Sequence, residues 1–340
     1  GGAMNSTGMS FANMYWGCVD QQLEDSSAKK DSDLGAPYIP QSLTSPIFSA
    51  CKSSLLSLLT TTFESKVLYA SPSSRVLAKT PRDFYMPNYE DVSVETRDGK
   101  LVHGWLIKRK DPRQYPTILH FHGNACNISH MLYDALGMFQ KVKANILLID
   151  YRGYGQSEGS PSEAGLMLDA EAALDYLLRR PDVADPASIF LFGRSLGGAV
   201  AIELAARRES AVRGVVVENT FTSIDDLVRH LSPALCRPVL RNLSSKWDTL
   251  RVIPQIRRPI LFLSGRADEI VPPFMMTALY RAAVQSAGRE MAAFPKGRHN
   301  STCLARGYYE TMRRFVDRVL VSSGDGAYVV DGGGAGGDDM

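Results

Sequence analysis

Residues 189–199 read IFLFGRSLGGA, and this stretch decides the fold of the chain. Its first four residues form an uninterrupted apolar run, as in a strand that is buried on both faces. The pentapeptide Gly-x-Ser-x-Gly follows, and the alanine-rich residues up to Arg208 then predict a helix. A serine in the sharp turn between such a strand and helix has a strained backbone that projects its hydroxyl off the sheet, and small neighbours prevent clashes. We therefore predict that Ser195 is a nucleophile.

The rest of the chain supplies the context that this pentapeptide needs, because Gly-x-Ser-x-Gly also occurs in ordinary glycine-rich turns. From Asp91 onward, short apolar runs alternate with helical patterns. We expect strands at Val92–Thr96, Leu101–Lys108, Thr117–Phe121, Asn145–Tyr151, Ser188–Phe192, Gly214–Glu218, Pro259–Leu263 and Glu290–Phe294. Asp98-Gly99 joins the first two as an antiparallel hairpin. The pattern predicts an α/β fold, with a mostly parallel central sheet covered by helices on both faces.

The clearest helix is expected at Pro161–Arg180. Ser160 and Glu163 match a capping box around Pro161 at the first helical position. One apolar stripe of this helix is formed by Leu166, Ala170, Ala173, Leu174 and Leu177. The stripe indicates a helix that packs against the sheet.

The composition is that of a soluble globular protein and excludes several classes of function. The 340 residues, 44% hydrophobic and 22% charged, suffice for a large core. There are 38 basic and 36 acidic residues, so no global field attracts nucleic acid or an anionic membrane. The five cysteines are widely spread, with no C-x-x-C pair or zinc-ligand spacing. We expect free thiols in a reducing compartment, a monomer, and no metal, organic cofactor or nucleic-acid partner.

The two ends of the chain differ from the middle. We expect an extension over residues 1–62, largely disordered with a short helix, a folded domain over 63–322, and a disordered glycine-rich tail over 323–340. Pro46–Phe63 is the most apolar part of the extension, but Lys52 interrupts it, and it falls short of the ~20 apolar residues of a membrane span. It also lacks the flanks of a signal peptide. These features favour an intracellular protein, cytoplasmic or peripheral on the cytoplasmic face of a membrane.

Polar residues after neighbouring strands extend the expected site, because an α/β sheet carries its chemistry at the carboxyl ends of its strands. Residues 122–125, which read HGNA, follow the third expected strand. A backbone N–H there, for which we favour that of Asn124, can join the N–H of Leu196 to hold the oxyanion of a tetrahedral intermediate. The alternative is a tight turn before a helix that starts near Asn127.

An acid and a histidine lie on the last two loops at the same edge. Asp268 follows the strand expected at Pro259–Leu263, and His299 follows that expected at Glu290–Phe294. The chain order Ser195, Asp268, His299 is that of nucleophile, acid and base in a hydrolase with this type of elbow. The acid would orient and stabilise the imidazolium that forms during acyl transfer. The sequence thus predicts a Ser-His-Asp triad.

Other residues compete for these roles. The rival bases are His103, His120, His122, His130 and His230, the rival acids are Glu218 and Glu269, and the nearby thiols are Cys126 and Cys303. Chain order and loop position favour His299 and Asp268, and the thiols are expected to be bystanders. Residues 150–155, which read DYRGYG, are interpreted as a turn stabilised by Asp150 and Arg152 rather than as a pocket wall. His122 and Tyr154 are nevertheless candidates for substrate contact.

Six segments together resemble a known family. They are His120–Ala125, Asp150–Gly159, Phe192–Ala201, Glu218–Phe221, Asp268–Pro273 and Gly297–Asn300. They are similar to the bud-emergence-type alpha/beta hydrolases, the group around alpha/beta-hydrolase domain-containing protein 13, and the match runs from about Phe63 to Val321. The resemblance implies the alpha/beta-hydrolase fold and the roles of nucleophile, base and acid at Ser195, His299 and Asp268. Similarity to protein depalmitoylases suggests acyl ester or thioester substrates, whereas similarity to prolyl-oligopeptidase-like serine peptidases points to amide bonds.

The chain departs from its relatives in two places. Such relatives commonly carry a membrane anchor before the catalytic domain, for which Pro46–Phe63 is a weak match. Cys126 stands where the family usually has the last glycine of His-Gly-Asn-Ala-Gly. Neither proposed oxyanion donor is removed by this change.

Residues 222–252 are expected to form a small helical lid that sets specificity. Its larger apolar residues are Leu227, Leu231, Leu235, Val239, Leu240, Leu243 and Trp247. They either line an acyl-binding surface, with Leu227 and Leu231 as pocket candidates, or simply pack the lid onto the sheet. Its basic residues are interpreted as a solvated face, and the alternative is that they help the segment approach an anionic surface.

The function predicted from the sequence is hydrolysis of a carboxylic ester or thioester, palmitoyl and other acyl-protein thioesters included, through an acyl-enzyme. A prolyl-oligopeptidase-like serine peptidase is the alternative among enzymes. In another class, the chain is a non-catalytic hydrolase-fold binding protein, against which the complete set of three residues argues.

Overall fold

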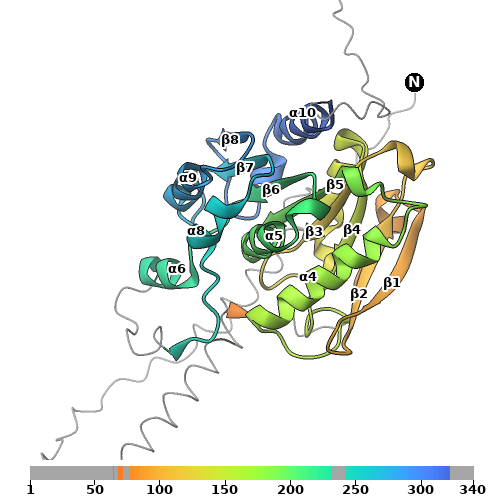
Figure 1. The fold of residues 1–340 in the computed structure, drawn as a ribbon, viewed down its shortest axis with the longest axis horizontal. Helices are drawn as coiled ribbons and strands as arrows, with labels where there is room; N and C mark the ends of the chain where they lie inside the picture. Colours follow the sequence, from red (N-terminus) through yellow and green to blue (C-terminus); the bar gives the residue numbers. More distant parts are fainter. Residues whose placement is uncertain (1–63, 65–67, 72–76, 232–241, 322–340) are drawn as a thin grey trace, which may run out of the picture.

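The computed structural model describes residues 64, 68–71, 77–231 and 242–321 (Figure 1). These residues form one eight-stranded sheet with helices on both faces. The expected extension 1–62 and tail 323–340 lie outside the described residues. Within the described part, every helix is too short or too polar to span a lipid bilayer.

The sheet has the predicted strands, with their ends displaced by a few residues. They are β1 (Tyr89–Glu95), β2 (Leu101–Ile107), β3 (Thr117–Phe121), β4 (Asn145–Ile149), β5 (Ile189–Arg194), β6 (Gly214–Glu218), β7 (Ile260–Gly265) and β8 (Arg289–Phe294). Their order across the sheet is β1-β2-β4-β3-β5-β6-β7-β8. β2 is antiparallel to β1 and β4, and the other neighbouring pairs are parallel. The expected α/β fold is therefore confirmed.

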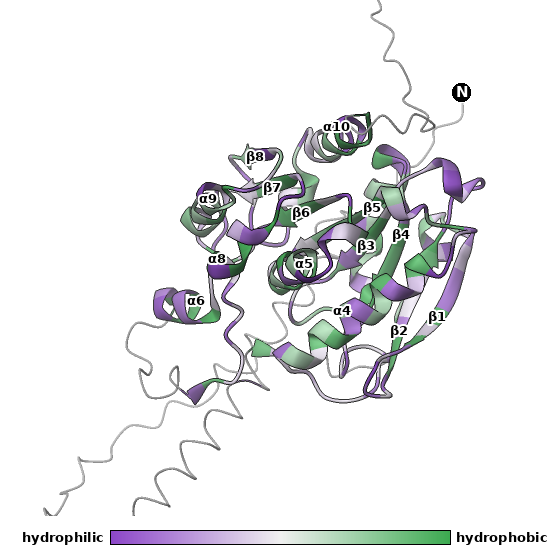
Figure 2. Cartoon of the chain, viewed as in Figure 1, coloured by the Kyte–Doolittle hydropathy of each residue, from purple (hydrophilic) through white to green (hydrophobic). Residues whose placement is uncertain are grey.

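Helices cover both faces of the sheet because the central strands are apolar on both sides (Figure 2). One face packs against α4 (Glu163–Leu178), α5 (Leu196–Arg207), α8 (Thr249–Val252) and α9 (Pro273–Ala282). The other packs against α3 (Leu132–Gly137), η5 (Met138–Val142) and α10 (Tyr308–Val321). Val215 and Val217 of β6 lie in the first core and Val216 in the second, as the alternation of side chains along a strand requires.

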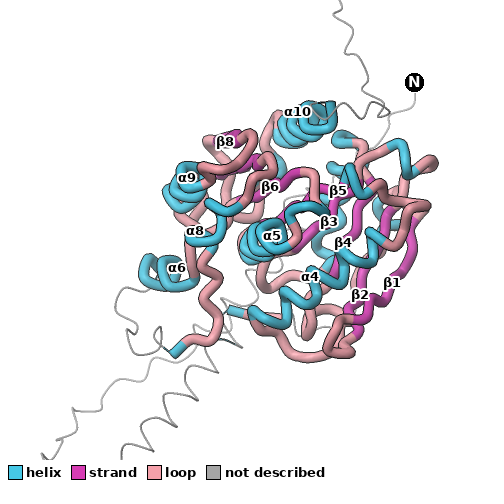
Figure 3. Tube along the Cα trace, viewed as in Figure 1, coloured by secondary structure: helices cyan, strands magenta, loops and turns pink. Residues whose placement is uncertain are grey.

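Short helical turns occupy several of the connections between strands and helices (Figure 3). They are η2 (Pro81–Phe84), η3 (Pro112–Gln114), η4 (Ile128–Met131), η6 (Pro186–Ser188), η7 (Glu209–Ala211), η8 (Ile253–Gln255) and η9 (Thr302–Leu304). Asn127 caps η4 through its side chain, which accepts the N–H of Ser129 at 3.0 Å. The helical segment expected near Asn127 is therefore present.

Helix α4 begins later than the sequence pattern suggests. Its N-cap is Ser162, whose Oγ accepts a backbone N–H of the first turn at 3.1 Å. The predicted capping box of Ser160 and Glu163 is wrong, because the Glu163 carboxylate instead accepts the backbone N–H of Trp247 at 3.0 Å. The expected apolar stripe is buried.

The turn after β4 is stabilised by Arg152, as expected. Its Nε donates to Asp169 Oδ1 at 2.9 Å, and its two Nη atoms donate to Asp98 at 2.8 and 2.9 Å. Asp98 belongs to the β1–β2 turn, so one guanidinium joins the hairpin to α4. Burial raises the pKa of Asp169 to about 6, although Arg152 opposes this shift. Arg152 is thus the counter-charge of a buried carboxyl group.

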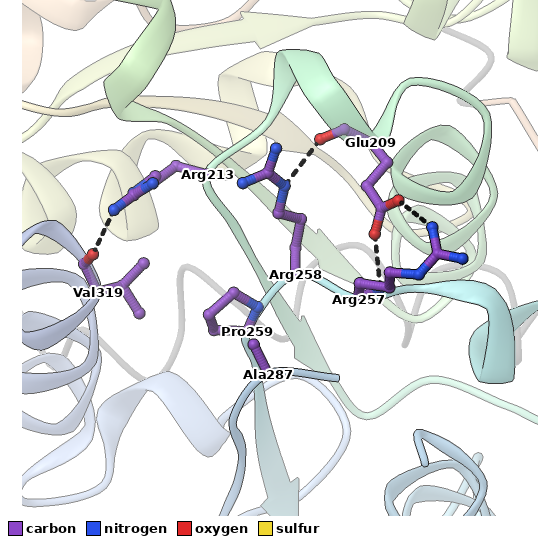
Figure 4. Close-up of a pocket in the computed structure, with 7 residues that line it drawn as sticks. All are labelled: Glu209, Arg213, Arg257, Arg258, Pro259, Ala287 and Val319. Atoms are coloured by element: carbon purple, nitrogen blue, oxygen red, sulfur yellow. Dashed lines mark hydrogen bonds and ion pairs between the residues drawn. The ribbon is translucent and has the colours of Figure 1, made fainter. Parts of the chain in front are cut away.

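A cavity of about 400 Å³ lies beside the first residues of β6 and β7, at the amino ends of these strands (Figure 4). Its arginines already have structural contacts. Arg213 donates to Val319 O at 3.0 Å, Arg258 Nε donates to Glu209 O at 3.0 Å, and Arg257 pairs with the Glu209 carboxylate at 3.3 Å. These contacts fasten the amino edge of the sheet, whereas the predicted chemistry lies at the carboxyl edge.

Candidate active site

Ser195 occupies the turn between β5 and α5 with a strained backbone. Its φ of 54° and ψ of −117° form a combination that non-glycine residues rarely adopt. A Cβ on Gly193 would lie 2.0 Å from the carbonyl O of Gly197, and a Cβ on Gly197 would lie 2.1 Å from that of Phe121. Glycine is therefore required on both sides of the serine. The elbow expected from the sequence is present.

The strand end of β6 fastens this elbow. The Ser195 N–H donates to Glu218 O at 2.9 Å, and the Thr220 hydroxyl donates to Ser195 O at 2.7 Å. A Cβ on Gly198 would lie 2.5 Å from Thr220 Cβ, so α5 begins in direct contact with this segment. The backbone N–H and C=O of Ser195 are thus both hydrogen-bonded to residues at or just after the end of β6.

His299 and Asp268 form a buried pair on the loops after β8 and β7. His299 Nδ1 lies 2.9 Å from Asp268 Oδ2 and 3.1 Å from Oδ1. Asp268 Oδ1 also accepts the backbone N–H groups of Ile270 at 2.9 Å and Val271 at 2.8 Å, which orient the carboxylate. A carboxylate only accepts, so Nδ1 carries the proton and Nε2 of a neutral ring carries a lone pair. This imidazole can accept a proton at Nε2 while Asp268 stabilises the resulting charge.

Asn219 positions the histidine loop, and the reasoning from sequence did not identify it. Its Nδ2 donates to the carbonyl oxygens of His299 at 3.1 Å and Arg298 at 3.3 Å, and to Thr302 Oγ1 at 3.0 Å. Its Oδ1 accepts the Gly265 N–H at 2.8 Å. Its φ is 46°, a left-handed conformation that asparagine tolerates better than most residues. An asparagine directly after a central strand was the available signal.

The two halves of the candidate site therefore share one anchor. Glu218, Asn219 and Thr220 are consecutive, and they bind the elbow of Ser195 on one side and the loop of His299 on the other. The candidate nucleophile and base are both attached to the carboxyl end of β6.

The loop of residues 122–125, here the oxyanion-side loop, adjoins the elbow. A Cβ on Gly123 would lie 3.7 Å from Ser195 Cβ. Asn124 Oδ1 accepts the Tyr154 hydroxyl at 2.9 Å. Leu196 is the first residue of α5, where backbone N–H groups have no acceptor within the helix. The segments that carry the two predicted oxyanion donors thus lie next to Ser195.

The side chains of His122 and Tyr154 are completely buried. The rings lie 5.4 Å apart, and Tyr151, which donates to His122 O at 2.9 Å, packs against both. In this conformation they support the oxyanion-side loop. Their contact with substrate stays a prediction.

The rival acids have other partners. Glu218 Oε2 accepts Arg194 Nε at 3.0 Å and the Tyr308 hydroxyl at 2.7 Å, and burial raises the pKa of Glu218. Glu269 pairs with Arg298 at 3.3 Å. Asp268, by contrast, contacts the ring of His299 directly.

His120, His230 and Cys303 lie in settings that differ from that of His299. His120 is buried in β3 with its ring centroid 4.7 Å from that of Phe192. His230, at the end of α6 (Ile224–Leu231), packs edge-on against Phe274. Cys303 is a buried free thiol whose pKa is raised by burial, as expected of a bystander. His103, His122 and His130 gather around Asp150.

Residues 232–241 of the predicted lid lie outside the described residues, and the structure describes the lid residues on either side of them. Leu227 of α6 is half-buried against the core, and Leu231 is 52% exposed. Leu243 and Trp247 are buried, and Trp247 Nε1 donates to the Tyr69 hydroxyl at 3.0 Å. The last two residues therefore pack the lid onto the domain. The apolar candidates that lie outside the described residues are Leu235, Val239 and Leu240.

Hydrogen bonds join the two ends of the segment that is predicted to form a lid. The Leu250 N–H donates to Thr222 O at 2.9 Å, and the Thr249 hydroxyl donates to the same oxygen at 2.8 Å. The Thr249 hydroxyl also contacts Phe221 O. The chain thus leaves and re-enters the domain at adjacent points.

The chain is similar to known proteins. A family model described as "Serine aminopeptidase, S33" matches residues 113–255. Protein bem46 of Schizosaccharomyces pombe is 37% identical over 289 residues, which cover 81% of this chain and 96% of that protein. The alpha/beta hydrolase domain-containing protein WAV2 of Arabidopsis thaliana is 42% identical over 244 residues, which cover 68% of this chain and 79% of WAV2. The chain belongs to the alpha/beta-hydrolase family.

The fold of this alpha/beta hydrolase agrees with that of solved relatives. The esterase Pf2001 of Pyrococcus furiosus matches it with a TM-score of 0.61 at 20% identity, over 74% of this chain and 97% of the esterase. At this identity the match shows the shared fold. The resemblance found in the sequence is confirmed at the level of family and fold.

Proposed function

We propose that this alpha/beta hydrolase is a serine hydrolase that cleaves a carboxylic ester or thioester, acyl-protein and palmitoyl thioesters included. The observation that carries the proposal is the buried His299–Asp268 pair, which leaves His299 Nε2 as a base. Support comes from the strained elbow of Ser195, which is anchored on the same three residues as the histidine loop.

The proposed reaction is acyl transfer in two steps. His299 Nε2 takes the proton of the Ser195 hydroxyl as Oγ attacks the substrate carbonyl, and Asp268 stabilises the imidazolium. The backbone N–H groups of Leu196 and Asn124 stabilise the oxyanion, and loss of one such donor typically costs about 3 kcal/mol in the transition state. The imidazolium protonates the leaving alcohol or thiol. Water, deprotonated by the same histidine, then releases the acid and restores the serine.

The test is covalent labelling with a fluorophosphonate. The wild-type protein should be labelled with one probe per chain, and Ser195→Ala should abolish labelling. Ser93→Ala is the matched control, because Ser93 is an exposed serine of β1. Labelling that survives in Ser195→Ala, or a wild-type protein that is never labelled, contradicts the proposal.

A serine peptidase is the second candidate, since the matching family model carries the description of a serine aminopeptidase. Ester, thioester and amide hydrolysis use the same catalytic groups. Parallel rates on an acyl thioester, an acyl ester and a peptide amide decide between them. We expect the thioester and ester to react faster than the amide.

A non-catalytic binding protein is the alternative from another class. Turnover of a short-chain nitrophenyl ester that is lost in Ser195→Ala argues against it, and absence of turnover together with absence of labelling supports it. Peripheral membrane association and the monomeric state stay predictions, to be checked by vesicle co-sedimentation and by light scattering.

A further inference from the structure

Three titratable side chains meet behind the oxyanion-side loop. Asp150, directly after β4, is completely buried between His103 of β2 and His122 at the end of β3. Asp150 Oδ2 lies 4.0 Å from His103 Nδ1, and Asp150 Oδ1 lies 3.5 Å from His122 Nε2. Oδ1 also accepts the Ile128 N–H at 2.9 Å. Asp150 Oδ2 and both facing ring nitrogens are buried without a hydrogen-bond partner.

The other nitrogen of each ring shows where its proton lies. His122 Nδ1 is 2.7 Å from Gly123 O, and His103 Nε2 is 2.7 Å from Asp91 Oδ1. Carbonyl and carboxylate oxygens only accept, so both of these ring nitrogens carry a hydrogen. In neutral rings, each nitrogen that faces Asp150 therefore carries a lone pair and can only accept a hydrogen bond. An ionised Asp150 would then face two acceptors, one on each side.

One additional proton removes this conflict. A buried carboxylate with one backbone donor and no counter-charge is strongly unfavourable, whereas an imidazolium beside it supplies a donor for the second oxygen and the missing charge. We propose that His103, Asp150 and His122 share one extra proton, and that this proton holds the oxyanion-side loop in the position that Ser195 chemistry needs. The proposal rests on the proposed function for its effect on catalysis, but the shared proton itself does not.

His103 is the principal site of this proton. Burial pulls the pKa of His103 down, but the carboxylates of Asp150 and Asp91 outweigh burial and raise this pKa above its ordinary value. Burial lowers the pKa of His122, with Asp150 in partial opposition. A histidine whose pKa is raised by folding adds stability below its ordinary pKa, and this contribution is lost as pH rises through the raised pKa. The cluster should therefore loosen as pH rises through the raised pKa of His103.

The remaining neighbours do not supply the missing charge. The ring of Trp105 lies edge-on to that of His103 with centroids 6.0 Å apart, and Ser157 Oγ accepts the backbone N–H of His103 at 2.8 Å. His130 faces Asp150 from η4, but burial lowers the pKa of His130. Its Nδ1 accepts the Asn127 N–H at 3.1 Å. The charges that act on His103 thus come from Asp91 and Asp150.

The cluster reaches the candidate site through two short steps. His122 Nδ1 holds Gly123 O, and a Cβ on Gly123 would lie 3.7 Å from Ser195 Cβ. Movement of His122 therefore moves the backbone beside the nucleophile and shifts the Asn124 N–H from the oxyanion position. Displacements near 1 Å at a reacting centre can reduce rates about 10²-fold. His103 and Asp150 act as positioning residues.

The variant Asp91→Asn tests this inference. Asp91 is 67% exposed on an edge strand, so the substitution should leave the fold intact. It removes one carboxylate from His103 and should lower the pKa of His103 by about half a pH unit. Asp111→Asn is the matched control, because Asp111 is exposed and its side chain makes no capping hydrogen bond.

Two readouts are needed. Histidine-selective NMR titration, feasible with six histidines in the chain, measures the pKa of His103 and the response of His122 signals at the same pH. The rate of fluorophosphonate labelling against pH measures the effect on Ser195. In the wild-type protein, the labelling rate should decline as pH rises through the His103 pKa. In Asp91→Asn, this decline should move to lower pH by the same amount as the His103 pKa, while the maximum labelling rate stays unchanged. His103→Gln should abolish the decline, and Asp111→Asn should change neither the His103 pKa nor the pH of the decline.

Each other outcome overturns a stated part. If His122 signals do not respond as His103 titrates, the shared proton is wrong. If the labelling profile stays fixed while the His103 pKa moves, the positioning role is wrong. If the wild-type protein is not labelled at any pH, the proposed function fails, and the NMR titration still decides whether the proton is shared.

Discussion

Replacing Asn219 with aspartate should detach the histidine loop while leaving the shape of the residue unchanged. The aspartate keeps an oxygen for the Gly265 N–H, but it replaces the donor Nδ2 with an acceptor. That acceptor would face the carbonyl oxygens of His299 and Arg298, now at 3.1 and 3.3 Å from Nδ2. Asn219 is only 1% exposed, so water cannot compensate. The amide has two N–H groups, so the loss of their donations at about 1 kcal/mol each predicts a loss of roughly 2 kcal/mol in the free energy of unfolding.

The assay combines urea unfolding with the rate of fluorophosphonate labelling. The urea midpoint should fall at a constant slope, and labelling should slow about 10²-fold because the loop that carries His299 moves. Asn88→Asp is the control, since exposed Asn88 makes two comparable donations to backbone carbonyls at 3.0 and 3.2 Å. It should cost less than about 1 kcal/mol. Equal stability and equal labelling in the two variants would refute the anchoring role of Asn219.

Three further outcomes are expected. Gly197→Ala should destabilise the protein by about 3 kcal/mol or more in urea unfolding, because the new Cβ would lie 2.1 Å from a backbone oxygen of β3. The control Gly288→Ala should be neutral, because nothing lies within 4 Å of its Cβ position. Similar urea midpoints for the two variants would contradict the close packing at the elbow. Arg152→Met should lower the free energy of unfolding, measured by calorimetry, by about 3 kcal/mol, because Asp169 stays buried without its counter-charge. Adding Asp169→Asn should restore part of the lost stability. A neutral single variant would show that the ion pair contributes little. Iodoacetamide at neutral pH should leave Cys303 unmodified in the folded protein and modify it after denaturation, because Cys303 is buried and burial raises the pKa of its thiol. Peptide mass spectrometry measures the modification. Rapid modification of the native protein would show that the thiol is accessible.

The central strands could be predicted because they are buried on both faces and therefore read as continuous apolar runs. Runs such as 214–218 are apolar on both faces, and this pattern needs no knowledge of the partners. Helix starts were less accessible. Both Ser160 and Ser162 precede α4 with an acid nearby, and the choice depends on Glu163 binding the backbone of Trp247, far away in the sequence.

The candidate site divides in the same way. Ser195, Asp268 and His299 follow strands and occur in a fixed chain order, so one-dimensional spacing suggests them. Asn219 is different, because its partners come from the loops after β7 and β8 and become neighbours only in the folded sheet. The proton shared by His103 and His122 is equally invisible in the sequence, since it follows from which acceptor each ring nitrogen meets.

The hydrogen bonds between the two ends of the predicted lid make that segment suitable for exchange with the corresponding segment of another protein. Thr222 and Leu250 are joined by a hydrogen bond, so an insert begins and ends at adjacent points, and each doubling of its length costs only about 0.6 kcal/mol in loop-closure entropy. Lids of related alpha/beta hydrolases should therefore be exchangeable at this junction. A series of such chimeras would test whether this segment sets the proposed acyl specificity while Glu218, Asn219 and Thr220 keep the same contacts to the turn of Ser195 and the loop of His299.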